Sequence, residues 1–168
     1  MGEERSRCST VKRVFILVEG QTEERFVKDV LAPEFYPLEM FFDVRLLITK
    51  LVKHGTSFKG GITTYGKFKN DVRRLLAESK GTLATTLVDY YGLPLDFPGM
   101  DTRPNAPPIE RVAHVERNIR ADLGDPANFL PFLALHEYEA WLFSSPDELP
   151  RTMTQSETGK TLRRFATR

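Results

Sequence analysis

The sequence predicts an α/β fold with a mainly parallel sheet and helices on both of its faces. Short apolar runs alternate along the chain with segments of helical periodicity, which is the pattern of β-α-β units. Several of the runs are continuously apolar, as expected of strands that are covered on both faces. The chain has 168 residues, of which 40% are hydrophobic and 28% charged, so it suits one globular domain with a substantial core.

The first predicted strand, Val14 to Val18, leads directly into Glu19. A helix should follow it. Thr22 is a suitable N-cap, and the acidic residues in the first turn interact favourably with the positive end of the helix dipole. The buried stripe of this helix is expected to comprise Phe26, Val27, Val30 and Leu31, and Pro33 and Pro37 are expected to end it.

Two further strands flank a loop and a helix. Residues 43–52 are predicted to form the second strand and residues 53–61 a loop. Residues 65–79 show helical spacing of Phe68, Val72, Leu75 and Leu76, and Gly81 is expected to close this helix. Residues 83–88 form another apolar run, which ends at Asp89.

The C-terminal half continues the alternation. A loop rich in proline and glycine, residues 92–108, precedes a helix whose apolar positions are expected to be Ile109, Val112, Ile119 and Leu123. Residues 129–135 are predicted to be a strand at the sheet edge, because Pro131 cannot donate to a ladder. Residues 136–143 are predicted to begin a last helix.

Composition narrows the class of protein. The formal net charge of +1 gives no overall attraction to nucleic acid, so any basic surface must be local. A single cysteine, Cys8, fits a reducing cytosol, and no apolar run has the length of a membrane span. We therefore expect a cytoplasmic protein that does not enter the membrane, with a flexible segment at residues 1–10.

Acidic residues follow three of the predicted strands. Glu19, Asp89 and Glu137 stand at or just past strand ends, and Glu23 lies four residues after Glu19. The carboxyl ends of parallel strands share one edge, where ligands bind in such sheets. Crowded carboxylates raise one another's pKa unless a cation lies among them, and Mg²⁺ or Mn²⁺ suits such oxygen ligands. The alternative is that these carboxylates merely belong to solvated loops.

Three stretches resemble known families. "LVEGQTEERF" (residues 17–26) resembles the first motif of the Toprim fold, in the form found in overcoming-lysogenization-defect nucleases. "LVDYYGLPLDFPG" (residues 87–99) and "FLPFLALHEYEAWLF" (residues 129–143) resemble the DUF4276 family. The resemblance extends over residues 11–150 and implies a Toprim-like, Rossmann-like domain with four strands in the order 2-1-3-4.

The Toprim resemblance implies a Mg²⁺- or Mn²⁺-dependent nuclease or related phosphotransferase. By position, Glu19, Glu23 and Asp89 match the acidic residues of the family, with Glu19 and Asp89 in catalysis. The second aspartate of the family's Asp-x-Asp motif is Tyr91 here, which cannot act as an anionic ligand near neutral pH. Asp96 or Glu137 would supply the missing charge, or the site binds one metal weakly or none.

For several other residues the sequence leaves more than one role possible. Lys53 is expected to stabilise charge or to assist proton transfer. His136 is either a general acid or base, or a hydrogen-bonded histidine at a strand end. The cations Lys67, Lys69, Arg73 and Arg74 of the helix at 65–79 either contact a nucleic-acid backbone or form a solvated face.

The resemblance also implies partners. Nucleic acid is the expected substrate, DNA or RNA, with a role in defence against foreign DNA. A separate ATPase is the expected protein partner, since the chain has no Walker motif. The other hypothesis is a catalytically degenerate module that binds an ATPase or nucleic acid without chemistry. Residues 151–168 are expected to form a basic, weakly packed tail that either is solvated or grips nucleic acid, and self-association is expected if a core patch is left uncovered.

Overall fold

The computed structural model describes residues 12–47, 62 and 64–136. The chain divides into two compact units, residues 1–135 and 136–168, and the fold below is that of the first. In the described part of the chain, no helix combines the length and apolar character that crossing a membrane requires. Several predicted features lie outside the described residues: the segment at 1–10, the strand residues 48–52, the loop at 53–61 with Lys53, the helix after His136 with Glu137, and the tail at 151–168.

A parallel sheet organises the first unit. Its strands are β1 (Lys12–Val18), β2 (Met40–Leu46), β3 (Leu83–Asp89), β4 (Phe129–Leu130) and β5 (Leu133–Ala134). The order is β2-β1-β3-β4, with β5 also paired to β3, and every pairing is parallel. The predicted α/β class and the predicted strand order 2-1-3-4 are both confirmed. The fold differs from the prediction in its fourth strand, which is divided into β4 and β5.

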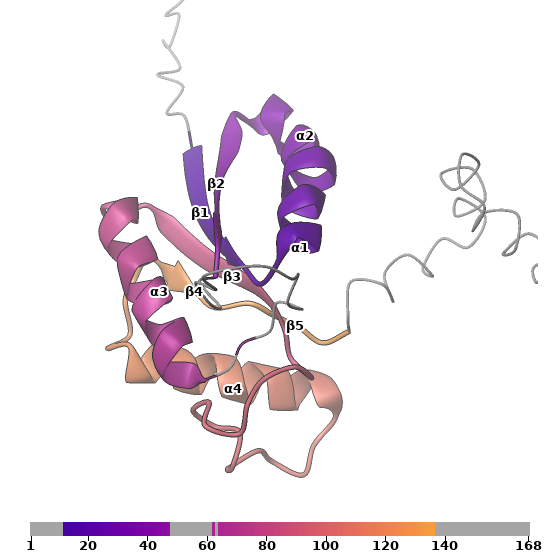
Figure 1. Ribbon diagram of the computed structural model, residues 1–168, viewed down its shortest axis with the longest axis vertical. Helices are drawn as coiled ribbons and strands as arrows, with labels where there is room; N and C mark the ends of the chain where they lie inside the picture. The colour runs from indigo at the N-terminus through magenta and orange to yellow at the C-terminus, as the bar shows by residue number, and fades with distance from the viewer. Residues whose placement is uncertain (1–11, 48–61, 63, 137–168) are drawn as a thin grey trace, which may run out of the picture. The chain divides into compact units, whose positions relative to one another are not determined.

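Helices lie on both sides of the sheet (Figure 1). The helix that follows β1 consists of α1 (Gln21–Arg25), a π-helical turn (Phe26–Leu31) and α2 (Ala32–Phe35). The opposite face is covered by α3 (Tyr65–Ser79) and α4 (Pro108–Asp122). Residues of β1 alternate between the two layers. Leu17 joins the core under α3 and α4, whereas Val14, Ile16 and Val18 are buried outside that cluster.

The first helix differs from its prediction at both ends. It begins at Gln21 with Gly20 as N-cap, and Thr22 is exposed and makes no capping hydrogen bond. It also continues past Pro33, because the preceding turns are π-helical and the Ala32 N–H reaches the Val27 carbonyl. This wider spacing accommodates a proline that has no N–H to donate. It also moves Val30 out of the predicted stripe, so that Val30 is 52% exposed.

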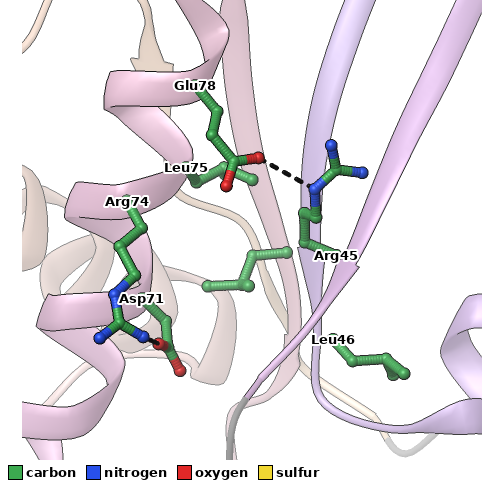
Figure 2. A pocket seen from close by; sticks show the side chains of 7 residues that line it. Arg45, Leu46, Asp71, Arg74, Leu75 and Glu78 are labelled. Atoms are coloured by element: carbon green, nitrogen blue, oxygen red, sulfur yellow. Dashed lines mark hydrogen bonds and ion pairs between the residues drawn. The ribbon is translucent and has the colours of Figure 1, made fainter.

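Strand β2 forms an edge of the sheet. It begins at Met40, three residues before the predicted start, and none of its residues is buried. Its link to the rest of the unit includes an ion pair with α3, in which the Nε of Arg45 lies 2.9 Å from the Oε2 of Glu78 (Figure 2). Asp71 and Arg74 of α3 pair below it at 3.3 Å. The two layers are therefore joined at this edge by charged side chains and by packing.

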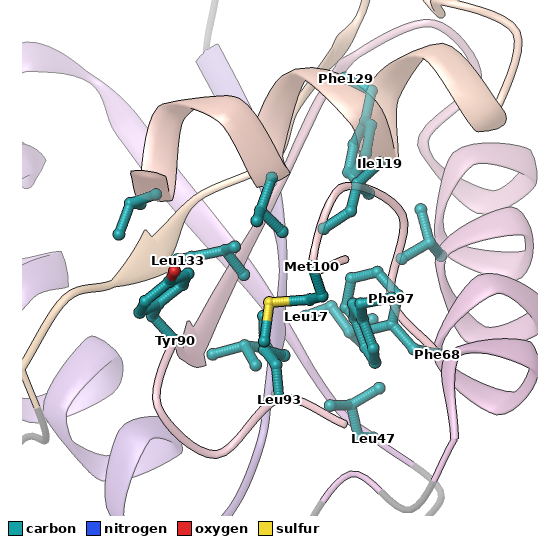
Figure 3. Close-up of a cluster of buried hydrophobic side chains, with 14 of the residues drawn as sticks. Leu17, Leu47, Phe68, Tyr90, Leu93, Phe97, Met100, Ile119, Phe129 and Leu133 are labelled. Atoms are coloured by element: carbon teal, nitrogen blue, oxygen red, sulfur yellow. The ribbon is translucent and has the colours of Figure 1, made fainter. Parts of the chain in front are cut away.

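One apolar cluster fills the space between the sheet and the α3–α4 layer (Figure 3). The predicted positions Phe68, Val72 and Leu75 of α3 are buried there. In α4 the buried residues include Val115. Ile109, one of the apolar residues from which this helix was predicted, is instead 63% exposed. The loop after β3 also contributes to this cluster, through Tyr90, Leu93, Phe97 and Met100.

Pro131 divides the last predicted strand, and a buried threonine of β3 bridges the gap. The side chain of Thr86, which is 1% exposed, accepts the N–H of Phe132 at 2.9 Å and donates to its carbonyl at 2.8 Å. Farther along, the carboxylate of Glu116 in α4 accepts the N–H of Leu133 at 2.8 Å. Side chains therefore replace the backbone ladder at this edge, as the edge position predicted from Pro131 requires.

Thr86→Val should destabilise the protein by about 2 kcal/mol, because it removes the hydroxyl of a buried side chain and leaves both backbone groups of Phe132 without that partner. Urea unfolding followed by circular dichroism measures this free energy. Thr85→Val is the matched control, since Thr85 makes only a 3.5 Å contact to a neighbouring carbonyl, and it should change stability by less than about 0.5 kcal/mol. Equal effects of the two substitutions would contradict the assigned role of Thr86.

Candidate functional site

Two of the predicted acidic residues meet at the carboxyl edge of the sheet. Because β1 and β3 are parallel neighbours with Val18 beside Leu87, Glu19 and Asp89 leave the sheet together. The backbone N–H of Asp89 donates to the Oε2 of Glu19 over 3.4 Å. The backbone of Ile62, far away in sequence, also hydrogen-bonds the Glu19 carboxylate. Glu19 thus connects β1, β3 and the segment that leads into α3.

Glu23 approaches the same point from the first turns of α1. A Cβ atom on Gly20 would lie 3.1 Å from the Oε2 of Glu23, so the Glu23 carboxylate folds back over Gly20 toward Glu19. Glu19 itself lies before the N-cap of α1, so the two side chains approach each other across the extended residue Gly20 and not along a helix face. The glycine leaves room for this approach, and its extended backbone imposes no strain.

The electrostatics of this cluster are unfavourable for a charged Glu19. Burial raises the pKa of Glu19 most, the hydrogen bond from Asp89 lowers it, and the negative charges of Asp89 and Glu23 raise it further. The hydrogen bond from Ile62 opposes the rise only in part. The net result is a carboxyl group whose pKa lies above its ordinary value and which a nearby cation would favour in its charged form.

The donor chemistry fits a hard divalent cation, since three carboxylates supply oxygen ligands and excess negative charge. Within residues 12–47, 62 and 64–136, however, no three histidine, cysteine, aspartate or glutamate side chains gather closely enough to hold a metal ion. The structure therefore shows an acidic cluster centred on Glu19 and no assembled set of ligands in its described part.

Other predicted site residues lie elsewhere or have other contacts. Asp96 accepts the backbone N–H of Tyr65 at 2.9 Å, so it holds the start of α3. Tyr91 is 61% exposed and packs edge-on against Tyr90, with ring centroids 5.3 Å apart. His136 is exposed.

The basic residues of α3 divide into two groups. Lys69 pairs with Asp122 of α4 at 2.6 Å, and Arg74 pairs with Asp71. The side chains of Lys67 and Arg73 are exposed on the helix surface. The backbone of Ile62 contacts Glu19, and α3 begins three residues later. Lys67 therefore lies in the first turn of α3, close in sequence to a residue that contacts the carboxylate cluster.

A small hollow lies between β2 and α3, and none of the three carboxylates lines it (Figure 2). It is lined by Leu17, Arg45, Leu46, Asp71, Arg74, Leu75 and Glu78.

The contacts of Ile62 with Glu19 and of Asp96 with α3 had no signal in the sequence, because both depend on loops that fold back over long sequence separations.

Comparison with known proteins gives one match. No curated protein and no solved structure matches the chain. The family described as Domain of unknown function (DUF4276) matches residues 18–167, which extends beyond residue 150, where the resemblance seen in the quoted stretches ends. The match covers most of the chain and includes Glu19, Glu23 and Asp89, and the protein belongs to the DUF4276 family.

Proposed function

We propose that this protein is a Mg²⁺- or Mn²⁺-dependent nuclease, or a related phosphotransferase, that acts on nucleic acid. The observation that carries the proposal is the convergence of Glu19, Glu23 and Asp89 at the carboxyl edge of a parallel sheet, with a raised pKa at Glu19. That edge is where ligands bind in open α/β sheets. The proposal also draws on the likeness of residues 17–26 to the first Toprim motif.

In this proposal the three carboxylates would hold the divalent ion once their side chains move closer together, because in the described residues no three acidic side chains are close enough to do so. When bound, the ion polarises a phosphate and activates water. Backbone groups of Asp89 and Ile62 that hydrogen-bond the Glu19 carboxylate support this role, because they favour its charged form. A cation at this point offsets the repulsion that raises the pKa of Glu19, so binding should release a proton where Glu19 is protonated.

A second candidate function has its own observation. Tyr91 stands where the family pattern implied by the Toprim resemblance has an acidic ligand, and its exposed ring packs on Tyr90. This favours a module that binds nucleic acid or a separate ATPase without cleaving phosphodiesters. The two proposals differ in whether the carboxylates bind Mg²⁺ or Mn²⁺ at all.

Titration calorimetry with Mn²⁺ should detect binding to the wild-type protein, and Glu19→Gln should weaken that binding by at least about 10-fold, because a charged ligand is lost. Glu24→Gln is the matched control. Glu24 lies in the same turn but pairs with Lys28 at 2.6 Å, so this variant should bind Mn²⁺ as the wild type does. Absence of Mn²⁺ binding at millimolar concentration would overturn the catalytic proposal and favour the binding module.

If the metal serves cleavage, Glu19→Gln and Asp89→Asn should each reduce hydrolysis of a labelled oligonucleotide by at least about 100-fold. Gel electrophoresis of single-stranded and duplex DNA and RNA substrates measures this and identifies the substrate class. Asparagine at position 89 keeps the backbone N–H that holds Glu19, so a loss of activity would follow from the missing charge. Full activity in both variants would contradict the proposed roles.

Lys67→Glu combined with Arg73→Glu tests whether α3 contacts the nucleic-acid backbone. Removing two phosphate contacts should weaken duplex binding and lower the slope of log affinity against log salt by about 2. Lys28→Glu, a charge reversal on the opposite layer, should leave the slope unchanged. An unchanged slope in the double variant would show that this face of α3 is merely solvated.

A further inference from the structure

Among the strands that the structure describes, β2 pairs only with β1, so one side of β2 has backbone groups without a neighbouring strand. Two hydrogen bonds show which of its residues face that side. The N–H of Lys12 donates to the carbonyl of Glu39, and the N–H of Leu47 donates to the carbonyl of Val18. In a parallel pair the residues that bond the neighbouring strand alternate, so the odd-numbered residues of β2 bond β1. The N–H and C=O groups of Phe42, Val44 and Leu46 therefore point away from the sheet.

The outward carbonyl of Val44 is held by a charged side chain. The Nη1 of Arg45 donates to it at 3.1 Å, while the Nε of the same guanidinium pairs with Glu78 of α3 (Figure 2). Asp43 lies two residues away on the same face of the strand and contacts Arg13 at 3.4 Å. In this edge strand Val44 thus has an acidic residue, Asp43, before it and a basic residue, Arg45, after it.

We propose that β2 pairs antiparallel with β2 of a second copy of this chain, about a two-fold axis through Val44. This register makes hydrogen-bonded pairs of Val44 with Val44 of the second copy and of Phe42 with Leu46 of the second copy. It also sets each Asp43 opposite Arg45 of the second copy, in the closer, non-hydrogen-bonded pairing. Opposite charges in this position stabilise a sheet.

Charge complementarity selects this register. An axis through Asp43 would place the two Asp43 carboxylates directly opposite each other, which is unfavourable. With the axis through Val44, the carbonyl of Val44 exchanges its bond with Arg45 for the N–H of Val44 of the second copy. The released Nη1 then donates to Asp43 of the second copy. The sheet becomes continuous across the axis, and Leu46, now exposed, gains an apolar neighbour.

Sedimentation velocity of the full chain tests the proposal. The wild type should form a dimer, and Asp43→Arg and Arg45→Asp should each raise its dissociation constant by about 100-fold, because like charges then face each other twice across the axis. Arg117→Asp, an exposed charge reversal on α4, should leave dimerisation unchanged.

Mixing the two variants gives the decisive result. Each fails to pair with itself, but Asp43→Arg and Arg45→Asp are complementary to each other, so an equal mixture should form a heterodimer. The double variant Asp43→Arg/Arg45→Asp restores both charge pairs across the axis and should also dimerise, more weakly than the wild type because each copy loses its pairs with Arg13 and Glu78. Recovery in the mixture also shows that both variants fold. A monomeric wild type, dimers that survive either single reversal, or a mixture that stays monomeric would each overturn the proposal.

Discussion

The parallel register of β1 and β3 is the constraint on which the candidate site depends. It places the end of β1 beside the end of β3, so that the Asp89 N–H reaches Glu19. A shift of either strand by one residue would turn its buried side chains to the other layer. Since Leu17 and Val88 lie in the same buried cluster, that shift would cost a large part of the core. The packing that fixes the register therefore also fixes the carboxylates.

The same arrangement maintains an electrostatic conflict. Burial and two neighbouring carboxylates disfavour the charged form of Glu19, while only two backbone donors favour it. Elsewhere in the described part of the unit several charged side chains form ion pairs, as Lys69 does with Asp122 and Arg45 does with Glu78. A partly buried acidic group whose charged neighbours in the described residues are both acidic is typical of a functional site, where stability is sacrificed for chemistry.

Patterns of apolar residues predict the sheet and α3 well, because a buried strand and an amphipathic helix each have a periodicity that the sequence displays directly. They fail where a local departure changes the geometry. The π-helical turn before Pro33 rotates Val30 to the surface, and Pro131 divides a strand whose ladder Thr86 then replaces. Neither compensation can be deduced from spacing, since each depends on hydrogen bonds made in three dimensions.

The candidate site was predictable in part for the same reason. Strand ends can be located from the sequence, so the approach of Glu19 and Asp89 follows from the predicted parallel sheet. The contacts of Ile62 and Asp96 do not follow, because they arise from loops that return to the sheet edge and to α3. The packing of the exposed Tyr91 ring on Tyr90 could not be predicted either, because it depends on the conformation of the loop after β3.

Titration of the individual carboxyl groups by carbon-detected NMR, without divalent ions, tests the central claim that Glu19, Glu23 and Asp89 form one coupled site. The pKa of Glu19 should lie above its ordinary value of 4.5. It should fall in Asp89→Asn, which removes the charge and retains the backbone donor, and in Glu23→Gln, whereas Glu24→Gln should leave it unchanged. A Glu19 that titrates at its ordinary pKa and does not respond to either neighbour would contradict the account.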